Sequence, residues 1–475
     1  MKSGDLDIAL RKTNLWWRQP HGWDTDDRDL RRAADAPYRY DPQLLRDIAP
    51  GGLYILNGPR RVGKSVEIKR AILRLIAAGV DPRRIIHASC EGWLAADLGA
   101  LVDHGRRIAT RGARQPRFWF LDEITGIRGD WPNRIKWLRD NDPFGEDCVV
   151  LTGSSARNLA EATKALAGRR GGASRSNLVL LPMGFKDFCR VIGLELPDIP
   201  SIRAKDFLRD RAAAVIEELH PWLNELIDAW EVYLQTGGFP QAVEDYIRHG
   251  EVREAFVDSL WDVIHGEAIR GVQFSAGQTQ ALLAQVAAAM ATPLNLEHLA
   301  RELGANGATV GRRLHELQEA FLVWPCHQEA HGEAHGAPRL RARSKLYFTD
   351  PLLARLAHLR NPDVVRPPDP TRLSEQQLGL SLLRQRESAE PGSYIRFESL
   401  MYRRTATKGE IDFVGPWLDG VPFESKYVDG AWRRDAQTAR AAYDGAVVLA
   451  TRSVVDYDGR ARAIPAPIVA LMLEP

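Results

Sequence analysis

The chain has 475 residues, of which 27% are charged and 44% hydrophobic, and its formal net charge is +2 at pH 7. This length suffices for two to four domains, and so small a net charge excludes a general attraction to nucleic acid, so any basic surface must be local. The four cysteines form no CxxC pair, the N-terminus lacks the apolar segment of a signal peptide, and no apolar run is long enough to cross a bilayer, so we expect a cytoplasmic protein with reduced thiols and no membrane partner.

The first 48 residues are predicted to form an extension ahead of the first domain. They combine many Arg and Asp residues with the aromatic side chains of Trp16, Trp17, Trp23, Tyr38 and Tyr40. Aromatic residues at this density usually pack onto a neighbouring domain, and flanking a nucleotide base is the alternative.

A glycine-rich motif follows, between a predicted strand at 53–56 and a predicted helix at 66–76. It matches G-x-x-x-x-G-K-S, in which glycines let backbone amides turn inward around a phosphate and the next helix adds its partial positive charge. Lys64 can reach the β- and γ-phosphates, and the Ser65 hydroxyl can bind Mg²⁺. A chance glycine turn is the alternative. The predicted nucleotide-binding residues are Gly58, Pro59, Arg60, Arg61, Val62, Gly63, Lys64, Ser65 and Val66.

A buried strand is predicted at 84–90, and two further predicted strands carry polar residues where they end. The strand that begins at Arg117 ends in Asp122 and Glu123, which predicts that Asp122 completes the Mg²⁺ shell through water and that Glu123 orients or activates the attacking water. A simple polar strand end is the alternative. The strand at 148–152 is followed by Ser154 and Ser155, which we expect to sense the γ-phosphate or to position water.

Arg169 and Arg170 lie in a glycine-rich segment further on. One of them is a candidate arginine finger, which would neutralise charge as the γ-phosphate departs. A solvated basic loop is an equally good interpretation. A finger acting in trans would require a homo-oligomer.

Seven short motifs occur together in one known family: Asn14-x-Trp16-Trp17, Gly58 to Ser65, Leu121 to Ile124, Leu151 to Ala156, Gly168-Arg169, Leu181 to Phe188 and Gly237 to Pro240. With them the chain resembles the bacterial and archaeal AAA-type ATPases that carry a C-terminal DUF4143 region. The resemblance implies ATP hydrolysis on an α/β, AAA-like P-loop core with a parallel sheet at 49–195, followed by a winged helix and a nuclease-like end.

Apolar residues at helical spacing predict a helical lid over 196–275. A winged helix-turn-helix is predicted at 276–360, with helices at 296–303 and 308–321. Arg312 and Arg313 on the second helix are offset by nearby glutamates, whereas residues 339–346 predict a strand with one basic face. That face suits phosphates of DNA or RNA, and a solvated edge strand is the alternative.

A cysteine and three histidines near this wing raise the question of a zinc site. The segment has the composition of a variable loop and contains no paired cysteine, which disfavours a metal site there. The residues are Cys326, His327, His331 and His335.

A proline-rich linker at 361–371 precedes a last predicted domain, 372–475. Glu375 lies early in a predicted helix, and strand alternation places Asp412, Glu424 and Lys426 on one face of two predicted strands. Two carboxylates can hold Mg²⁺ or Mn²⁺ while a lysine orients or deprotonates water. This Asp…Glu-x-Lys pattern is similar to that of the restriction-endonuclease-like, PD-(D/E)xK nucleases. The alternative is the charged outer face of a hairpin.

Together these patterns predict a Mg²⁺-dependent ATPase that couples its nucleotide state to DNA or RNA handling by the winged-helix and nuclease-like domains. The alternative is an ATP-dependent switch that binds a protein partner and whose nuclease-like domain is an inert docking module.

Overall fold

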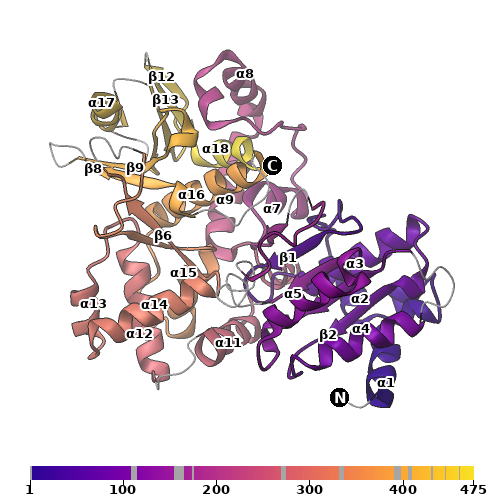
Figure 1. Ribbon diagram of the computed structural model, residues 1–475. Helices are drawn as coiled ribbons and strands as arrows, with labels where there is room; N and C mark the ends of the chain where they lie inside the picture. Colours follow the sequence, from indigo (N-terminus) through magenta and orange to yellow (C-terminus); the bar gives the residue numbers. More distant parts are fainter. Residues whose placement is uncertain are drawn as a thin grey trace. The chain divides into compact units, whose positions relative to one another are not determined.

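The computed structural model describes residues 3–108, 115–153, 165–173, 176–268, 274–330, 336–389, 397–404, 409–428, 430, 432–443, 446–458 and 460–475. These residues divide into two compact units, one that ends at Leu181 and one that begins at Pro182 (Figure 1). Residues 182–195, which the sequence placed with the ATPase core, group with the second unit. Within the described ranges, no helix is both long and apolar enough to span a membrane.

The first unit contains a five-stranded parallel sheet, which confirms the predicted α/β class. Its strands are short and almost wholly buried, as expected for a parallel sheet covered on both faces. The spatial order is β2-β3-β4-β1-β5, with β1 (Leu53–Asn57), β2 (Ile85–Ser89), β3 (Phe118–Asp122), β4 (Cys148–Thr152) and β5 (Asn177–Val179).

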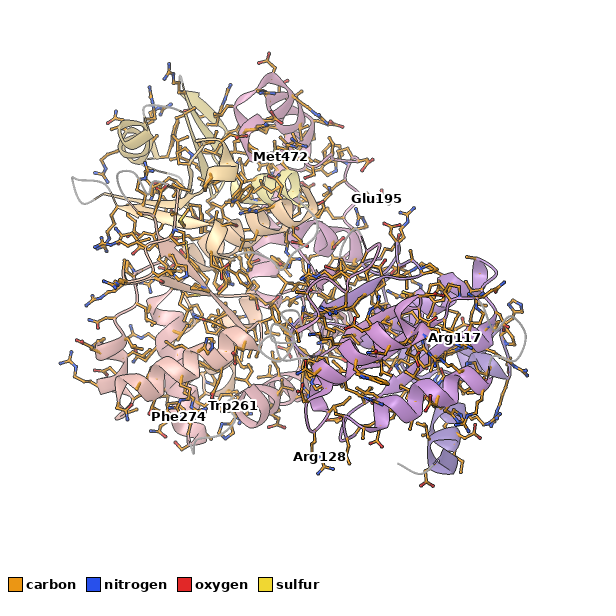
Figure 2. All side chains as sticks on the ribbon, viewed as in Figure 1. Arg117, Arg128, Glu195, Trp261, Phe274 and Met472 are labelled. Atoms are coloured by element: carbon orange, nitrogen blue, oxygen red, sulfur yellow. The ribbon has the colours of Figure 1, made fainter. Side chains whose placement is uncertain are left out.

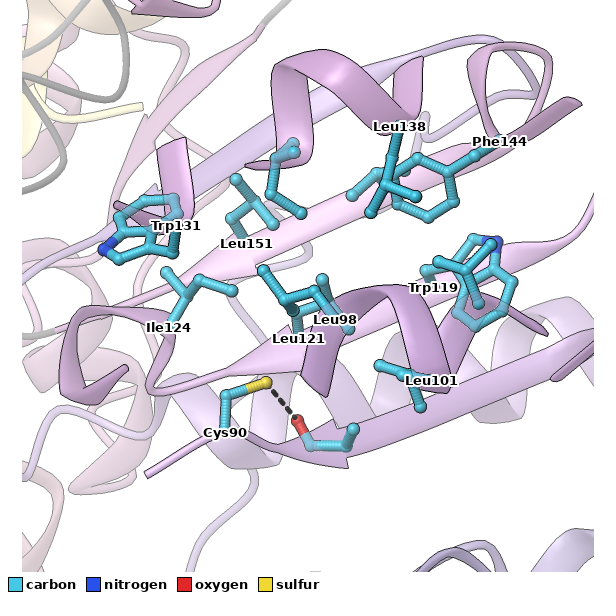
Figure 3. Packing of buried hydrophobic residues seen from close by; sticks show 14 of the residues in the cluster. Cys90, Leu98, Leu101, Trp119, Leu121, Ile124, Trp131, Leu138, Phe144 and Leu151 are labelled. Carbon is cyan, nitrogen blue, oxygen red and sulfur yellow. Dashed lines mark hydrogen bonds between the residues drawn. The ribbon is translucent and has the colours of Figure 1, made fainter. Parts of the chain in front are cut away.

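Helices α4 (Asp97–Ile108) and α5 (Trp131–Asn141) pack on one face of this sheet. Figure 3 shows Leu98 and Leu101 of α4 and Leu138 of α5 meeting the strand residues Trp119 and Leu121. All are nearly or fully buried, so each large-to-small change there would cost about 2–5 kcal/mol.

The N-terminal extension contains helices α1 (Ser3–Thr13) and α2 (Arg28–Asp35) and covers the edge strand β2. The buried Asn14 side chain donates to the His87 carbonyl at 2.8 Å and accepts from the His87 amide at 2.7 Å. The indoles of Trp16 and Trp17 both donate to the Ile85 carbonyl. These bonds satisfy backbone groups that an open sheet edge would expose. The packing interpretation therefore accounts for Trp16 and Trp17.

The same extension also contacts α3 (Lys64–Ala77), the helix that begins at the glycine-rich loop. Lys69 of α3 pairs with Asp27 at 2.8 Å and with Asp29 at 2.7 Å. The buried Glu67 carboxylate accepts from the Leu45 amide at 2.8 Å. The first 48 residues are thus bound to both the edge of the sheet and the helix of the loop.

The second unit begins with a helical region. The two helices predicted at 296–303 and 308–321 are present as α13 and α14. The helices of this region are α7 (Phe185–Val191), α8 (Asp210–Leu219), α9 (Leu223–Thr236), α10 (Pro240–His249), α11 (Glu254–Val263), α12 (Ala276–Ala289), α13 (Leu296–Glu302), α14 (Gly307–Glu319) and α15 (Pro351–Arg360).

An eight-stranded mixed sheet forms the rest of this unit, flanked by α16 (Pro370–Ala389), α17 (Trp432–Tyr443) and α18 (Ala466–Leu473). The hairpin of β6 and β7 joins it because β6 pairs with β8, so the sheet runs across the linker predicted at 361–371. The order is β12 (Asp456–Asp458), β13 (Ala461–Pro465), β11 (Val447–Thr451), β10 (Phe423–Lys426), β9 (Glu410–Val414), β8 (Met401–Arg404), β6 (Val323–Gln328) and β7 (Lys345–Phe348).

The prediction of a basic strand at 339–346 is wrong. Strand β7 begins only at Lys345, and the residues before it form turns and irregular backbone. Arg339, Arg341 and Arg343 lie outside the ladder and are exposed, whereas Lys345 is fully buried. Alternation of residue types alone therefore misplaced the one cation of this segment that the fold buries.

Helix α18 is buried along its whole length, as an apolar surface on all sides predicts. Met472, labelled in Figure 2, is fully buried within it. Just beyond the helix, the Glu474 carboxylate accepts from the Lys186 amide at 2.9 Å and from the Ser381 hydroxyl at 2.7 Å. The last residues of the chain thus cap α7 at the start of the unit.

Asp350 links the Gly237 to Pro240 motif to the sheet. Its buried carboxylate accepts from the Gly238 amide and the Leu352 amide, both at 2.8 Å, and so caps α15. Burial raises the pKa of Asp350 to about 7, although both hydrogen bonds oppose that shift.

We expect Asp350→Asn to flatten the pH dependence of stability. Because its folded-state pKa lies above its unfolded value, Asp350 contributes stability below about pH 4 that is lost as the pH rises through about 7. Urea unfolding at intervals from pH 4 to 8 should show the wild-type slope exceeding that of the variant by up to about 1.4 kcal/mol per pH unit. The exposed Asp363→Asn is the matched control, and identical slopes for wild type and Asp350→Asn would contradict the expectation.

Candidate functional site

The loop between β1 and α3 has the backbone that a phosphate-binding loop requires. Gly58 and Gly63 have φ angles of 140° and 98°, and Arg61 lies in the left-handed region at 70°. A Cβ atom on Gly58 would lie 2.0 Å from the Leu180 carbonyl oxygen, so only glycine fits there. Helix α3 starts at Lys64, which places its positive N-terminal end at the loop.

Lys64 lies inside this loop. Its ammonium donates to the carbonyls of Gly58 at 2.9 Å and Pro59 at 2.8 Å. Burial lowers the pKa of Lys64 to about 8, while the nearby Glu123 and Asp122 oppose that shift. The loop therefore surrounds one cation whose charge is balanced by two acids at the end of β3.

Asp122 lies at the end of the sheet where three strands finish side by side. Strand β4 lies between β1 and β3, so the carboxyl ends of all three are adjacent. The hydroxyl of Ser65 donates to Asp122 Oδ2 at 3.0 Å, and the hydroxyl of Thr152 donates to Oδ1. Burial would raise the pKa of Asp122, but His87 and these two hydroxyls hold it well below its usual range. The carboxylate is therefore an anion beside Ser65.

The pair of Ser65 and Asp122 fits the donor set of Mg²⁺. A hydroxyl oxygen and a carboxylate are hard oxygen ligands, and Mg²⁺ commonly takes only one or two protein ligands besides waters and phosphate. Within the described part of the chain, no group of three or more His, Cys, Asp and Glu side chains is arranged to hold a metal by itself. The residues present thus suit a cation that arrives with a phosphate ligand.

Glu123 follows directly in a strained conformation. Its φ of 51° is left-handed, which is uncommon outside glycine and persists where surrounding contacts enforce it. The Glu123 amide donates to Asp122 Oδ1 at 3.1 Å and to Thr152 Oγ1 at 3.2 Å. Burial raises the pKa of Glu123, while Lys64 and Arg60 act in the opposite direction.

His87 and Thr152 belong to this site but had no role in the sequence analysis. His87 Nε2 lies 3.9 Å from Asp122 Oδ2, and its backbone is held by Asn14. Parallel pairing of β2 with β3 brings the histidine to the acid. The sequence signal that could have identified them is a polar residue in a mainly apolar strand, His87 in β2 and Thr152 in β4.

Ser154 and Ser155 lie outside the described residues. Arg169 and Arg170 lie at the amino end of β1, whereas the loop follows the carboxyl end of that strand. Arg169 pairs with Asp140 at 3.0 Å, and the Arg170 carbonyl accepts from the amide of Leu53, the first residue of β1. A five-residue strand of about 13 Å separates them from the loop. An arginine finger acting within its own chain has no support here, and one acting in trans stays a prediction.

Two of the predicted acids of the second unit, Glu375 and Asp412, lie beside a lysine together with Glu410, which the sequence analysis did not single out. Lys345 Nζ lies 2.9 Å from Glu375 Oε1, 2.8 Å from Glu410 Oε1 and 3.0 Å from Asp412 Oδ1. The Tyr347 hydroxyl donates to the same oxygen of Glu375. Burial opposes the charge of Lys345, yet the surrounding acids hold its pKa well above the usual value.

Glu424 and Lys426 complete this cluster. Lys426 Nζ lies 3.5 Å from Glu424 Oε2, and the intervening Ser425 amide donates to Asp412 Oδ2 at 3.0 Å. Burial and the nearby Asp412 raise the pKa of Glu424 well above its usual range. Asp412 and Glu424 are 7% and 2% exposed, so the charged outer face of a hairpin is the wrong interpretation.

The candidate zinc residues do not come together where they are described. Cys326 and His327 are neighbours on β6 and so project from opposite faces. Cys326 Sγ lies 3.7 Å from the Leu400 carbonyl, and burial raises the pKa of its thiol. His327 Nδ1 lies 2.8 Å from the Ser344 hydroxyl. His331 and His335 lie outside the described residues.

We expect Gly58→Ala to destabilise the first unit far more than Gly79→Ala does. Both glycines have positive φ, but a Cβ on Gly79 meets open space whereas one on Gly58 overlaps a backbone oxygen. Gly79→Ala should cost about 1 kcal/mol and Gly58→Ala at least about 2 kcal/mol more, measured by urea unfolding without nucleotide. Equal losses would show that the loop relaxes freely.

Comparison with known proteins gives two family matches. Residues 51–189 match the model of an AAA domain, and residues 227–363 match a domain of unknown function (DUF8612). The DUF4143 region implied by the resemblance is not confirmed. No curated protein matches the chain significantly.

Several solved structures are similar to the chain at low identity. The Walker-type ATPase PABY2304 of Pyrococcus abyssi is 13% identical, with 71% of this chain and 95% of that one covered and a TM-score of 0.34. A single-residue variant of Thermotoga maritima RuvB is 14% identical, with 70% and 89% covered and a TM-score of 0.26. The ORC2 protein of Aeropyrum pernix is 14% identical, with 65% and 87% covered and a TM-score of 0.31. Residues 51–189 thus match an AAA domain and contain a loop with the backbone of a phosphate-binding loop.

Proposed function

We propose that this protein binds and hydrolyses ATP with Mg²⁺ at the loop of the first unit. The observation that supports it most is the hydrogen bond from Ser65 to Asp122, because it joins the phosphate-binding loop to the acid of β3. The AAA match over the same residues supports the same nucleotide chemistry.

Each side chain has a role that its surroundings suit. Lys64 exchanges its loop carbonyls for the β- and γ-phosphate oxygens, and the N-terminal amides of α3 add partial positive charge. Ser65 and Asp122 would hold Mg²⁺, which when bound neutralises charge on the phosphates. Glu123 orients the attacking water and accepts its proton, and its raised pKa suits a general base. His87 and Thr152 fix the Asp122 carboxylate.

Two substitutions separate binding from turnover. We expect Lys64→Ala to weaken ATP binding strongly, and Glu123→Gln to retain binding but to lose turnover by about 10²-fold or more. Fluorescent-nucleotide titration measures the first effect, and phosphate release measures the second.

The exposed substitutions Lys12→Ala and Glu146→Gln are the matched controls and should leave both quantities unchanged. If Lys64→Ala bound and hydrolysed ATP as wild type does, the assignment of the loop would fail.

We further propose that α13, α14 and the β6–β7 hairpin act as a winged helix that contacts DNA or RNA according to nucleotide state. Arg312 is exposed on α14, and Arg339, Arg341 and Arg343 are exposed in the turn before β7. The glutamates that weakened this interpretation are engaged locally, because Glu316 pairs with the buried Arg313 and Glu319 lies 3.1 Å from His315.

Replacing the three turn arginines by alanine tests this contact. We expect weaker binding to duplex DNA and a salt dependence whose slope falls by roughly three, as lost phosphate contacts predict. The matched control replaces Arg190, Arg209 and Arg211, which are exposed elsewhere in the same unit. No binding to any nucleic acid by the wild type would favour the alternative, an ATP-dependent switch for a protein partner.

The α16 helix and the strands β8 to β11 support a restriction-endonuclease-like fold for the C-terminal residues, with Glu375, Asp412, Glu424 and Lys426 at matching positions. Fold similarity does not itself imply cleavage. Whether these acids accept Mg²⁺ or Mn²⁺ depends on Lys345.

A further inference from the structure

Three acids of the second unit surround a single point. Glu375 comes from α16, and Glu410 and Asp412 come from β9, yet one oxygen of each lies between 2.8 and 3.0 Å from Lys345 Nζ. A divalent cation bound by acids of the nuclease type would need the same convergence of carboxylate oxygens. The point is taken by an ammonium group that belongs to the chain itself.

The backbone that carries Lys345 is fixed on both sides of β7. Lys345 pairs with Cys326 of β6, and the carbonyl of the preceding Ser344 accepts from the Leu294 amide at 2.9 Å. The side chain is 0% exposed, and its Nζ lies 5.6 Å from the centre of the Tyr402 ring. The Lys345 side chain is therefore fully enclosed by the protein at the point where its three carboxylates meet.

We propose that Lys345 is the resident cation of this carboxylate cluster and holds the position that a divalent metal would take in a nuclease. The carboxylate cluster of the C-terminal domain then has a structural role, and the domain is not a metal-dependent nuclease. The acids bind the β6–β7 hairpin to β9 and α16. This inference concerns the second unit and stands independently of ATP hydrolysis in the first.

Electrostatics prevent a metal from sharing the point that the Lys345 ammonium occupies. A divalent ion added about 3 Å from a buried ammonium would meet strong repulsion, which a low-dielectric interior screens poorly. A metal at this point must displace Lys345, whose backbone is paired with β6.

The test replaces the ammonium by an apolar group of similar length. In nucleotide-free protein, Lys345→Met leaves buried acids without their partner and should lower the melting temperature by about 5–10 °C in EDTA. Millimolar Mn²⁺ should restore much of that loss, because the ion now enters the position of the ammonium. The double variant Lys345→Met/Asp412→Asn should gain nothing from Mn²⁺.

Lys205→Met is the matched control, because it breaks a surface pair with Asp419 at 3.3 Å and leaves the cluster intact. It should show neither the loss nor a response to Mn²⁺. Failure of Mn²⁺ to stabilise a folded Lys345→Met would overturn the proposal, since the acids would then not converge on a cation position.

A second measurement does not depend on any Lys345 variant folding. Electron paramagnetic resonance of free Mn²⁺, titrated into nucleotide-free wild type and into Asp412→Asn, should show the same number of bound ions for both. An ion bound to wild type and lost in Asp412→Asn would overturn the proposal, as would Mn²⁺-dependent DNA or RNA cleavage by wild type that Asp412→Asn abolishes.

Discussion

The first unit depends on the ionised carboxylate of Asp122. It accepts from Ser65 at the start of α3 and from Thr152 at the end of β4, and it lies 3.9 Å from His87 on β2. One buried anion thus ties the loop helix to three of the five strands. Burying a charge without partners is costly, so the hydroxyls that satisfy Asp122 also determine how the strand ends align. Asn14 extends this arrangement to the N-terminal extension through the backbone of His87.

Both units surround a lysine with acids, but the outcome differs. Lys64 sits among glycines, its acids are shared with Ser65, and its pKa falls to about 8 on burial. Lys345 is surrounded by three carboxylates, and its pKa rises well above the usual value. The first cation can exchange backbone carbonyls for a ligand at little cost. The second is neutralised by its own chain, so its removal would leave several buried charges unpaired.

Local patterns in the sequence were sufficient to predict four of the five strands of the first unit and the helix after the loop. Four apolar runs correspond to β1 to β4, and the motif from Gly58 to Ser65 correctly indicated a loop that requires glycine. The partners of Asp122 were harder to foresee, because His87 and Thr152 reach it only through strand order and register. Lys345 was missed for a similar reason. It is 67 residues from Asp412 in sequence, and only the pairing of β6 with β8 brings β7 beside the C-terminal strands.

The pairing of β6 with β8 has a consequence for how this protein can be divided. The proline-rich segment around 361–371 has the composition of a linker, yet one continuous sheet crosses it. A fragment that ended there would expose the edge of β6 and leave Lys345 without its carboxylates. Exposed strand edges invite pairing between chains, so such a fragment would aggregate. The helices before β6 and the strands after α16 must therefore be produced together.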